Sequence, residues 1–408
     1  METTAAQSLT DVDLLSVFEK AQRREFTSET IHPVLAEKRR ENPVYDGDLF
    51  LERFTPSLAI PGEKTVTVLG YDACVTVLRD SETFSSGYYL QTLGKTHGHN
   101  ILMLDGHEHR RHRRILREIF SRKELGPLRE KLIDPIVRDE YILPMSKGRS
   151  TANLVRDFFV SYPVEVLHRI LDLPADMLDD FNRFGMGTLL ISTGHVELAM
   201  ACSQALSELL IPIISERRSN PRDDAISLML ELSDEEILNT LRVLLAAGAE
   251  TTMRTSGNLM TGLLTHPDQF DLLKADRTLI ASAIEESLRW EGPIPEVHRL
   301  AMKDTELAGI TIPKGTHVRV VVMAANRDET EFTDPERFDI TRRPNPHLGF
   351  GHGSHLCLGM NLARAEITSM LDAILDRMPR LRLDDDYESP VIAGASFRSP
   401  PELHVRWD

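Results

Sequence analysis

One helical pattern of about thirty residues constrains this chain more than any other feature, because few globular domains contain a helix of that length. The pattern starts at Ser233, which forms a serine–x–x–glutamate capping box with Glu236, and it ends before Pro267. Apolar residues recur at helical spacing inside it: Ile237, Leu238, Leu241, Leu244 and Leu245. We expect a helix that crosses the whole core.

The rest of the chain predicts a mainly α fold with small β-sheets. Residues from about 105 to 380 are mostly helical in pattern, whereas strand signals lie at about 40–80 and 300–325. With 408 residues, 41% of them hydrophobic, the chain can bury a large core. Neither a linker nor a repeat is visible, so we expect residues 1–408 to form a single domain. A short C-terminal hairpin is expected between 391–392 and 404–407.

Composition limits the class of protein and its compartment. The net charge of −16 argues against nucleic acid as a partner. Three cysteines are too few for a disulfide framework and favour a reducing compartment. The N-terminal segment lacks the pattern of a signal peptide, and no stretch reaches the ~18 apolar residues of a membrane span. We expect a cytoplasmic protein with no membrane anchor.

Residues 350–359 place a cysteine, Cys357, in a glycine-rich loop at the mouth of a helix expected over about 358–378. The N–H groups and dipole of a helix N-terminus stabilise a thiolate. Gly351, Gly353 and Gly359 allow tight turns and the close approach of a flat ligand. A buried structural cysteine is the alternative. A zinc site fits poorly, because no second cysteine lies nearby.

This loop resembles the haem-binding loop of the cytochrome P-450 family, whose pattern Phe-x-x-Gly-x-x-x-Cys-x-Gly is filled by Phe350, Gly353, Cys357 and Gly359. The resemblance implies a soluble, bacterial-type member, with a multihelical fold whose long central helix crosses the haem. It also implies haem b, with the Cys357 thiolate as the metal ligand and with Phe350, Gly351 and Gly359 beside the cofactor. Such a thiolate favours cleavage of the O–O bond.

A glutamate–arginine pair, Glu286 and Arg289, lies on one face of the helix expected before Gly292. Pairs of this kind are more often solvated surface charges. In the family they form a buried structural network with an arginine of a later irregular stretch. We expect Arg337 to be that arginine.

Residues 247–252, Ala-Gly-Ala-Glu-Thr-Thr, lie midway along the long helix and resemble the family's oxygen-activation segment. Gly248 costs roughly 1 kcal/mol there relative to alanine, so we expect a local break in the helix. A polar stripe facing solvent is the alternative. The resemblance assigns proton delivery to Thr251 and Glu250, and it places Ala247 beside the haem.

Haem propionates need cationic partners, and four side chains match the positions that the family uses. Each of them taken alone is more often an ordinary surface residue. They are His109, Arg113, Arg299 and His355.

Electrons must come from a separate protein, because the chain has no dinucleotide-binding glycine motif and no room for a flavin domain. Residues 107–123 carry seven Arg and Lys against two Glu, a local charge of +5. A solvated helix face is the alternative. The resemblance puts this segment on the cysteine side of the haem and implies a 2Fe–2S ferredoxin with its ferredoxin reductase. We expect Arg110 and Arg114 to bind the ferredoxin.

The substrate pocket is expected to be mostly apolar, which suits a small hydrophobic molecule. Its two tyrosines either bind a polar group of the substrate or are core aromatics. By alignment to the family, the candidate residues are Tyr88, Tyr89, Val243, Ala247, Ile294, Val297 and Ile392.

These motifs predict a monomeric monooxygenase that inserts one oxygen atom of O2 into a C–H or double bond, with electrons from NAD(P)H. Two alternatives remain open: a peroxide-driven peroxygenase, against which the acid–threonine pair argues, and a non-catalytic haem sensor or carrier. The identity of the substrate does not follow from the sequence.

Overall fold

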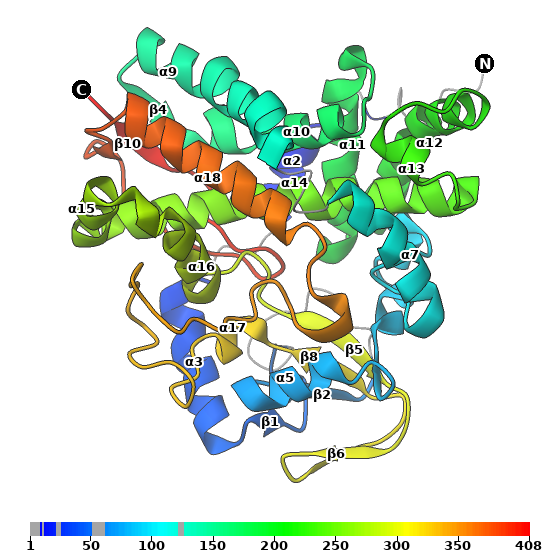
Figure 1. Ribbon diagram of the computed structural model, residues 1–408. Coiled ribbons are helices and arrows are strands. Elements are labelled where there is room, and N and C mark those ends of the chain that lie inside the picture. The colour runs from blue at the N-terminus through cyan, green and yellow to red at the C-terminus, as the bar shows by residue number, and fades with distance from the viewer. Residues whose placement is uncertain (1–8, 10–11, 22–25, 51–61, 121–125) are drawn as a thin grey trace.

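The computed structural model describes residues 9, 12–21, 26–50, 62–120 and 126–408 (Figure 1). Most of the long helices lie in the upper part of Figure 1, and the main sheet lies in the lower part. This arrangement confirms the predicted mainly α fold with small sheets. The single-domain organisation stays a prediction.

The predicted long helix is α14, Asp234–Thr265, which crosses the width of the molecule (Figure 1). Both halves of its capping box are present: the Glu236 N–H donates to Ser233 Oγ at 3.2 Å, and the Ser233 N–H donates to Glu236 Oε2 at 2.7 Å. The helix packs against α10, α11, α12, α16 and α18. Most of its side chains are buried, as expected for a helix through the core.

The other helices surround α14 or lie against the sheet. On the N-terminal side they are α2 (Leu14–Ala21), α3 (Ser28–Glu41), α5 (Tyr71–Arg79), α6 (Gly94–His97), α7 (Gly106–Ile119), α9 (Leu143–Gly148), α10 (Tyr162–Ile170), α11 (Leu178–Thr188), α12 (Val196–Ser219) and α13 (Ala225–Leu228). Three π-helical segments are Arg129–Ile133, Pro135–Ile142 and Val155–Phe159. After α14 come α15 (Pro267–Ala275), α16 (Ile280–Trp290), α17 (Val322–Ala325) and α18 (Met360–Arg377).

The main sheet joins the two regions where strand signals were expected. Its strand order is β1-β2-β8-β5-β3, and only β2 and β8 are parallel, with Thr65 opposite His317. Strands β2 and β8 are buried throughout, so they form the centre of this sheet. The bounds are β1 Val44–Tyr45, β2 Thr65–Val68, β3 Phe84–Ser85, β5 Val297–Ala301 and β8 His317–Val320.

Two smaller sheets complete the β structure. Strands β6 (Thr305–Leu307) and β7 (Ile310–Ile312) form a hairpin. Strand β10 (His404–Arg406) pairs with β4 (Thr151–Asn153) and β9 (Arg382–Leu383). The expected hairpin between 391–392 and 404–407 is therefore wrong, because β10 takes its partners from distant parts of the chain.

By length and composition, α12 is a helix that could cross a membrane. Of the 18-residue apolar stretch within α12, 44% is buried inside the protein, and the helix packs against α11 and α14. The core helices of soluble proteins have the same length and composition, so this single helix is weak evidence for a membrane span.

A buried histidine next to α14 should make stability depend on pH. His97 ends α6; its Nε2 lies 3.1 Å from the Thr188 hydroxyl, and its Nδ1 lies 2.8 Å from the Thr96 hydroxyl. Burial lowers the pKa of His97 to about 4, below its ordinary value of 6.5. The unfolded chain thus binds this proton first as the pH falls. We expect unfolding free energy to fall by up to about 3 kcal/mol between pH 6.5 and pH 4 on account of this residue.

Urea denaturation at several pH values tests the contribution of His97. The His97→Gln variant should show a weaker loss of stability between pH 6.5 and pH 4 than the parent protein. His195, which is exposed, supplies the control, and His195→Gln should leave the slope unchanged. Equal slopes for the parent protein and His97→Gln would contradict the assignment.

Candidate functional site

The Cys357 loop is held in shape by its backbone. The Cys357 N–H donates to the carbonyl oxygen of Phe350 at 2.8 Å, which closes the loop. Gly351 and Gly353 have φ of +74° and +71°, a region that favours glycine. A Cβ on Gly353 would lie 2.4 Å from the backbone oxygen of Leu78, so no other residue fits there. These glycines therefore fix the position of the cysteine against α5.

The sulfur of Cys357 lies at the mouth of α18, which starts two residues later than expected, at Met360. Burial raises the pKa of its thiol, while the N–H groups of Gly359 and Met360 and the guanidinium groups of Arg113 and Arg364 act in the opposite direction. The protein therefore does not hold a thiolate unaided, whereas a bound metal ion deprotonates a coordinating thiol outright.

Cys357 differs in exposure from the other two cysteines. Cys74 and Cys202 are buried, whereas Cys357 is partly accessible. Burial raises the pKa of both buried thiols. A ligand can thus reach Cys357, and the alternative of a buried structural cysteine fits Cys74 and Cys202 instead.

The middle of α14 has one accessible face, although the helix lies in the core. Ala247 is exposed, and Leu244, Gly248 and Thr251 are half-buried. The spacing i, i+3, i+4 and i+7 puts all four on one side of the helix. In Figure 1 the segment that leads into α18 lies below α14 and above β5 and β8. The accessible face of α14 is where the haem and substrate were expected.

Two expectations for this helix need correction or refinement. Helix α14 continues as an α-helix through Gly248, so the predicted break is wrong; the Thr251 hydroxyl instead donates to the Ala247 carbonyl at 2.6 Å within the helix. Glu250 is fully buried, and its carboxylate is ion-paired with Arg254, which donates to Ser399 Oγ at 2.7 Å. Sequence reasoning missed Arg254, although its i+4 spacing from Glu250 was a signal.

The four expected propionate partners come from three parts of the chain. The His109 and His355 rings lie 4.3 Å apart, and Arg113 Nη2 donates to the Leu356 carbonyl at 2.6 Å. Asp105, which sequence reasoning missed as an anchor, lies 3.1 Å from His355 Nε2. It also accepts hydrogen bonds from Ser85 and Ser86, so it fixes the position of His355.

Two of these four side chains have buried groups that a carboxylate would satisfy. Within the described residues, His109 Nε2 is buried with no hydrogen-bond partner. Arg299 is 5% exposed, and its guanidinium donates to the His298 carbonyl at 2.8 Å, a neutral acceptor rather than an acid. A buried charge without an acidic partner is costly. The residues therefore fit a ligand with carboxylate groups, such as haem.

The glutamate–arginine pair is buried, as expected, but its third member differs. Glu286 and Arg289 are fully buried and make two hydrogen bonds of 2.8 Å. The Arg342 side chain, not that of Arg337, reaches Glu286, at 3.2 Å. Arg337 is exposed and offers only its carbonyl, to Arg289 at 3.0 Å. The prediction for the Arg337 side chain is therefore wrong.

The candidate substrate residues differ in accessibility. Ala247, Ile294 and Val297 are at least partly accessible, whereas Val243 and Ile392 are buried. A substrate can therefore reach Ala247, Ile294 and Val297, whereas Val243 and Ile392 are core residues.

The two candidate tyrosines bind protein groups. The Tyr88 hydroxyl donates to Glu63 at 2.6 Å, and its ring stacks on His317 at 4.0 Å. The Tyr89 hydroxyl accepts the His298 N–H at 3.0 Å. Both side chains are buried. The structure therefore favours the interpretation of core aromatics over substrate contacts.

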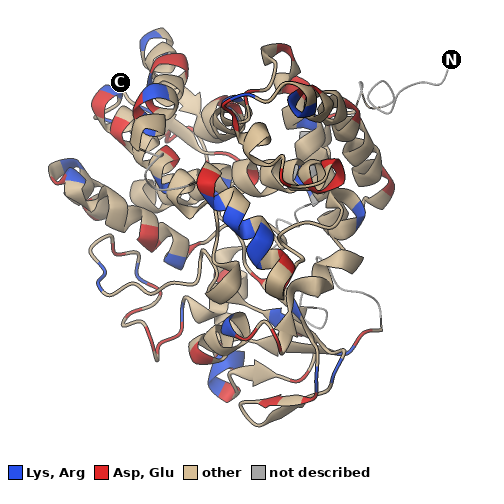
Figure 2. Cartoon of the chain, turned by 45° about the vertical axis from the view of Figure 1, so that its right-hand side comes forward, with Lys and Arg blue, Asp and Glu red and all other residues tan. Residues whose placement is uncertain are grey.

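The expected ferredoxin-binding residues are exposed on α7. Arg110 and Arg114 are exposed, and Arg114 is ion-paired with Glu231 at 2.6 Å. In the cartoon of Figure 2 the Lys and Arg positions along this helix are blue. Arg122 and Lys123, which were counted in the local charge, lie outside the described residues.

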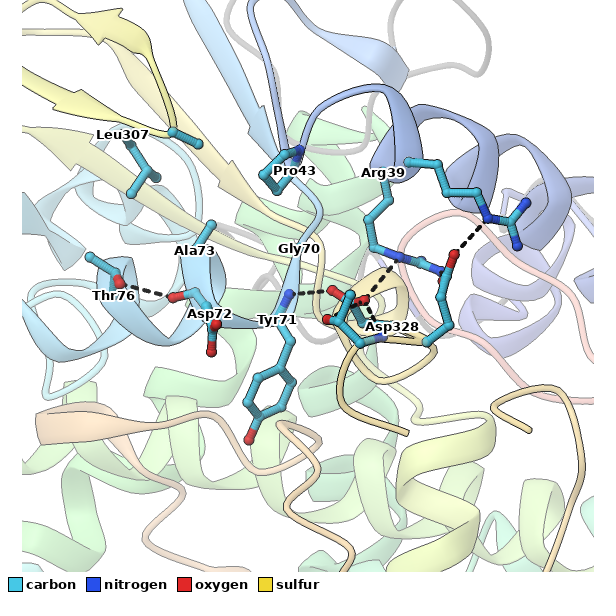
Figure 3. Close-up of a pocket in the computed structure, with 13 residues that line it drawn as sticks. Arg39, Pro43, Gly70, Tyr71, Asp72, Ala73, Thr76, Leu307 and Asp328 are labelled. Atoms are coloured by element: carbon cyan, nitrogen blue, oxygen red, sulfur yellow. Dashed lines mark hydrogen bonds and ion pairs between the residues drawn. The ribbon is translucent and has the colours of Figure 1, made fainter. Parts of the chain in front are cut away.

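A surface cleft of about 610 Å³ lies away from all these residues, between α3, α5 and the loop after α17 (Figure 3). Four of its charged groups are already partnered: Asp328 accepts the Tyr71 N–H at 2.8 Å, Arg40 binds Glu329 at 2.6 Å, and Arg39 pairs with both acids. The cleft contains none of the expected site residues, so we do not place the active site there.

Comparison with known proteins supports the sequence motifs. The cytochrome P450 family model matches residues 164–385. The chain is 30% identical over 393 residues to the biotin biosynthesis cytochrome P450 of Bacillus subtilis (strain 168), covering 91% of this chain and 94% of that protein. It is 32% identical over 400 residues to the cytochrome P450 monooxygenase PikC of Streptomyces venezuelae, covering 92% and 91%. The crystal structure of the myxobacterial cytochrome P450 CYP267B1 in complex with myristic acid superposes with a TM-score of 0.82 at 29% identity, covering 96% of this chain and 99% of that one.

Proposed function

The chain belongs to the cytochrome P450 family, and from that membership we propose that it is a ferredoxin-dependent monooxygenase of small hydrophobic molecules. Members of this family are oxidoreductases that incorporate oxygen and hold haem through a cysteine thiolate. The accessible Cys357 at the mouth of α18, together with the accessible face of α14, is the observation that carries the proposal. We further propose that it works as a cytoplasmic monomer, with NAD(P)H as the source of electrons.

When bound, haem supplies the redox chemistry that activates O2. We assign Cys357 as its axial ligand. We assign the binding of its propionate carboxylates to His109, Arg113, Arg299 and His355. His109 Nε2 and the Arg299 guanidinium are the buried groups in need of such partners. The accessible face of α14 would then lie along one side of the substrate.

Protons for the reaction are proposed to pass through the Thr251 hydroxyl. Its Oγ1 already donates to the Ala247 carbonyl, which orients the side chain toward the accessible face. Glu250 remains a proposed second member of the relay. Because its carboxylate is buried against Arg254, it would have to exchange protons through a rearranged ion pair.

The proposed substrate is hydrophobic, because the accessible residues of the expected pocket, Ala247, Ile294 and Val297, are apolar. The structural relative with bound myristic acid supports a fatty or similarly apolar molecule. A screen of such compounds for a shift of the ferric Soret band would identify ligands. We expect hits among fatty acids, terpenoids or steroids. A protein that binds none of them, or that reduces O2 without product in their presence, would contradict the proposal.

Replacing Thr251 tests the proton path. In Thr251→Ala we expect product formed per NAD(P)H consumed to fall at least about tenfold, because general acid–base groups contribute about 10²–10⁴-fold to rates. The electrons from NAD(P)H that are not used to form product should appear as hydrogen peroxide. Thr252→Ala is the matched control, since Thr252 is buried and its hydroxyl donates to the Gly248 carbonyl at 2.9 Å.

Comparison of Thr251→Ala with the parent protein separates the competing functions. A peroxide-driven peroxygenase would keep its peroxide-supported activity in Thr251→Ala, and a haem sensor would show no substrate turnover in the parent protein. Tightly coupled product formation by Thr251→Ala would contradict the role of Thr251.

Charge reversal on α7 tests the electron donor. In the double variant Arg110→Glu/Arg114→Glu, we expect the ferredoxin association rate constant to fall at least about tenfold at low salt, with a weaker dependence on ionic strength. The control double variant is Arg138→Glu/Lys147→Glu. Both residues are exposed, Lys147 on α9 and Arg138 in the π-helical segment before it, and Figure 1 shows α9 apart from α7. Stopped-flow reduction kinetics would measure the association rate constant and its salt dependence for each double variant. Equal effects in the two variants would refute specific docking on α7.

A further inference from the structure

We propose that α7 and the first turn of α14 form a binding site for a divalent transition-metal ion, in addition to the haem site. The ligands are Glu108 and His112 of α7 and Glu236 of α14. One donor atom from each lies within 4.8 Å of the other two. Donor atoms around one tetrahedral zinc ion lie about 3.4 Å apart, so small side-chain rotations would bring these three donors onto one ion.

The hydrogen bonding of His112 leaves one nitrogen available for a metal. Its ring is 3% exposed, and Nδ1 lies 3.0 Å from the Glu108 carbonyl oxygen. A carbonyl only accepts hydrogen bonds, so Nδ1 carries the hydrogen, and the lone pair of the neutral ring is on Nε2. Metal-binding histidines commonly donate their second N–H to a carbonyl in this way.

The position of Nε2 places its lone pair beside a carboxylate oxygen. It lies 3.4 Å from Glu236 Oε1. An imidazole nitrogen and a carboxylate oxygen that both present lone pairs to the same point form an arrangement that a metal ion can bridge.

The first turn of α14 presents Glu236 in a way that suits a metal ligand. Glu236 Oε2 accepts the Ser233 N–H at 2.7 Å and completes the capping box. Oε1 remains directed at His112 and can bind a metal while the cap is kept.

A guanidinium group already bridges the two carboxylates. Arg111 Nη1 lies 2.7 Å from Glu236 Oε1 and 3.4 Å from Glu108 Oε2. Its side chain is 32% exposed, so it can rotate into solvent when a metal ion replaces it. Arg111 is thus a competitor for the site rather than a ligand.

The donor set determines the kind of ion. One imidazole and two carboxylates are a borderline set that suits Zn²⁺, with water at the remaining positions. An ion bound there would link α7, which carries Arg110 and Arg114, to α14. Binding to the folded state alone would stabilise that contact. This proposal rests on geometry and not on the proposed function.

Titration of Zn²⁺ into the untagged holoprotein by calorimetry tests the site. We expect one saturable site and a higher thermal midpoint in the presence of Zn²⁺. His112→Gln and Glu108→Gln should each weaken binding at least about tenfold. Arg111→Gln should tighten binding, because it removes the competing cation. Glu118→Gln is the matched control on the same helix, since Glu118 is exposed and lies ten residues after Glu108.

Two results would overturn the proposal. One is the absence of saturable binding by the parent protein and by Arg111→Gln. The other is equal affinity in the parent protein, His112→Gln and Glu108→Gln. Either would mean that Glu108, His112 and Glu236 form only a polar cluster held by the Arg111 ion pairs. Haem absorbance and ferredoxin kinetics measured alongside would report separately on the proposed function.

Discussion

The Cys357→Ser variant is expected to lose the red-shifted Soret band of the reduced carbon monoxide complex and all measurable monooxygenase turnover. A serine at this position keeps the hydrogen bond to the Phe350 carbonyl, since the backbone N–H of residue 357 donates it. It does not supply the electron-rich sulfur that favours cleavage of the O–O bond. The loss would therefore be electronic, with the loop still closed. Absorbance spectroscopy of the reduced protein under carbon monoxide measures the band.

Cys74→Ser and Cys202→Ser are the matched controls, because both cysteines are buried. We expect both controls to keep the red-shifted band, with at most a modest loss of stability. Far-ultraviolet circular dichroism of all three variants would confirm that the fold is retained. A folded Cys357→Ser protein with an unchanged band would show that another group ligates the iron.

Local signals in the sequence were enough to predict the elements that carry the site. The capping box at Ser233 and the proline at 267 predicted α14 to within one residue at each end, because both act through groups only a few residues away. The tight turns at Gly351 and Gly353 were predicted for a similar reason. Glycine has no Cβ, so its tolerance of a positive φ does not depend on distant residues.

Contacts between distant segments could not be predicted in the same way. Arg342 rather than Arg337 reaches Glu286, because the path of the irregular stretch after α17 decides which side chain points inward. Tyr88 and Tyr89 are bound by Glu63 and by the His298 N–H, partners that only the assembled sheet brings close. Sequence patterns give the residue type and the helix face, but not the partner.

The family resemblance supplied what the local patterns could not. Only the resemblance brought His109, Arg113, Arg299 and His355 together as partners of one ligand, since they lie on three separate segments. The structure adds Asp105 as the side chain that holds His355. It also shows, within the described residues, that His109 Nε2 is buried without a partner and that the buried Arg299 donates to a carbonyl rather than to an acid, and this is the physical reason to expect a carboxylate beside them.

The Glu286→Ala variant is expected to lower the unfolding free energy by about 3–5 kcal/mol, because it leaves a buried arginine without its acid. Glu286 accepts two hydrogen bonds from Arg289, and it also accepts from the Asp339 N–H at 2.9 Å and from Arg342. All these donors would lose their acceptor together. Chemical denaturation of the holoprotein, followed by circular dichroism, measures the change. Asp376→Ala is the control, since Asp376 pairs with Arg277 on the surface and should cost no more than about 1 kcal/mol.

Loss of this pair should also loosen the cysteine loop, through a short chain of hydrogen bonds. Arg289 Nη1 donates to the Asn326 carbonyl at 3.0 Å, and Asn326 Oδ1 accepts the Leu348 N–H at 2.7 Å. The Leu348 carbonyl in turn accepts the Gly351 N–H at 2.8 Å, inside the loop that ends at Cys357. We therefore expect Glu286→Ala to release haem to an apoprotein acceptor faster than Asp376→Ala does. If the two variants lost stability to different extents but released haem at the same rate, the ion pair would support the fold without positioning the cysteine.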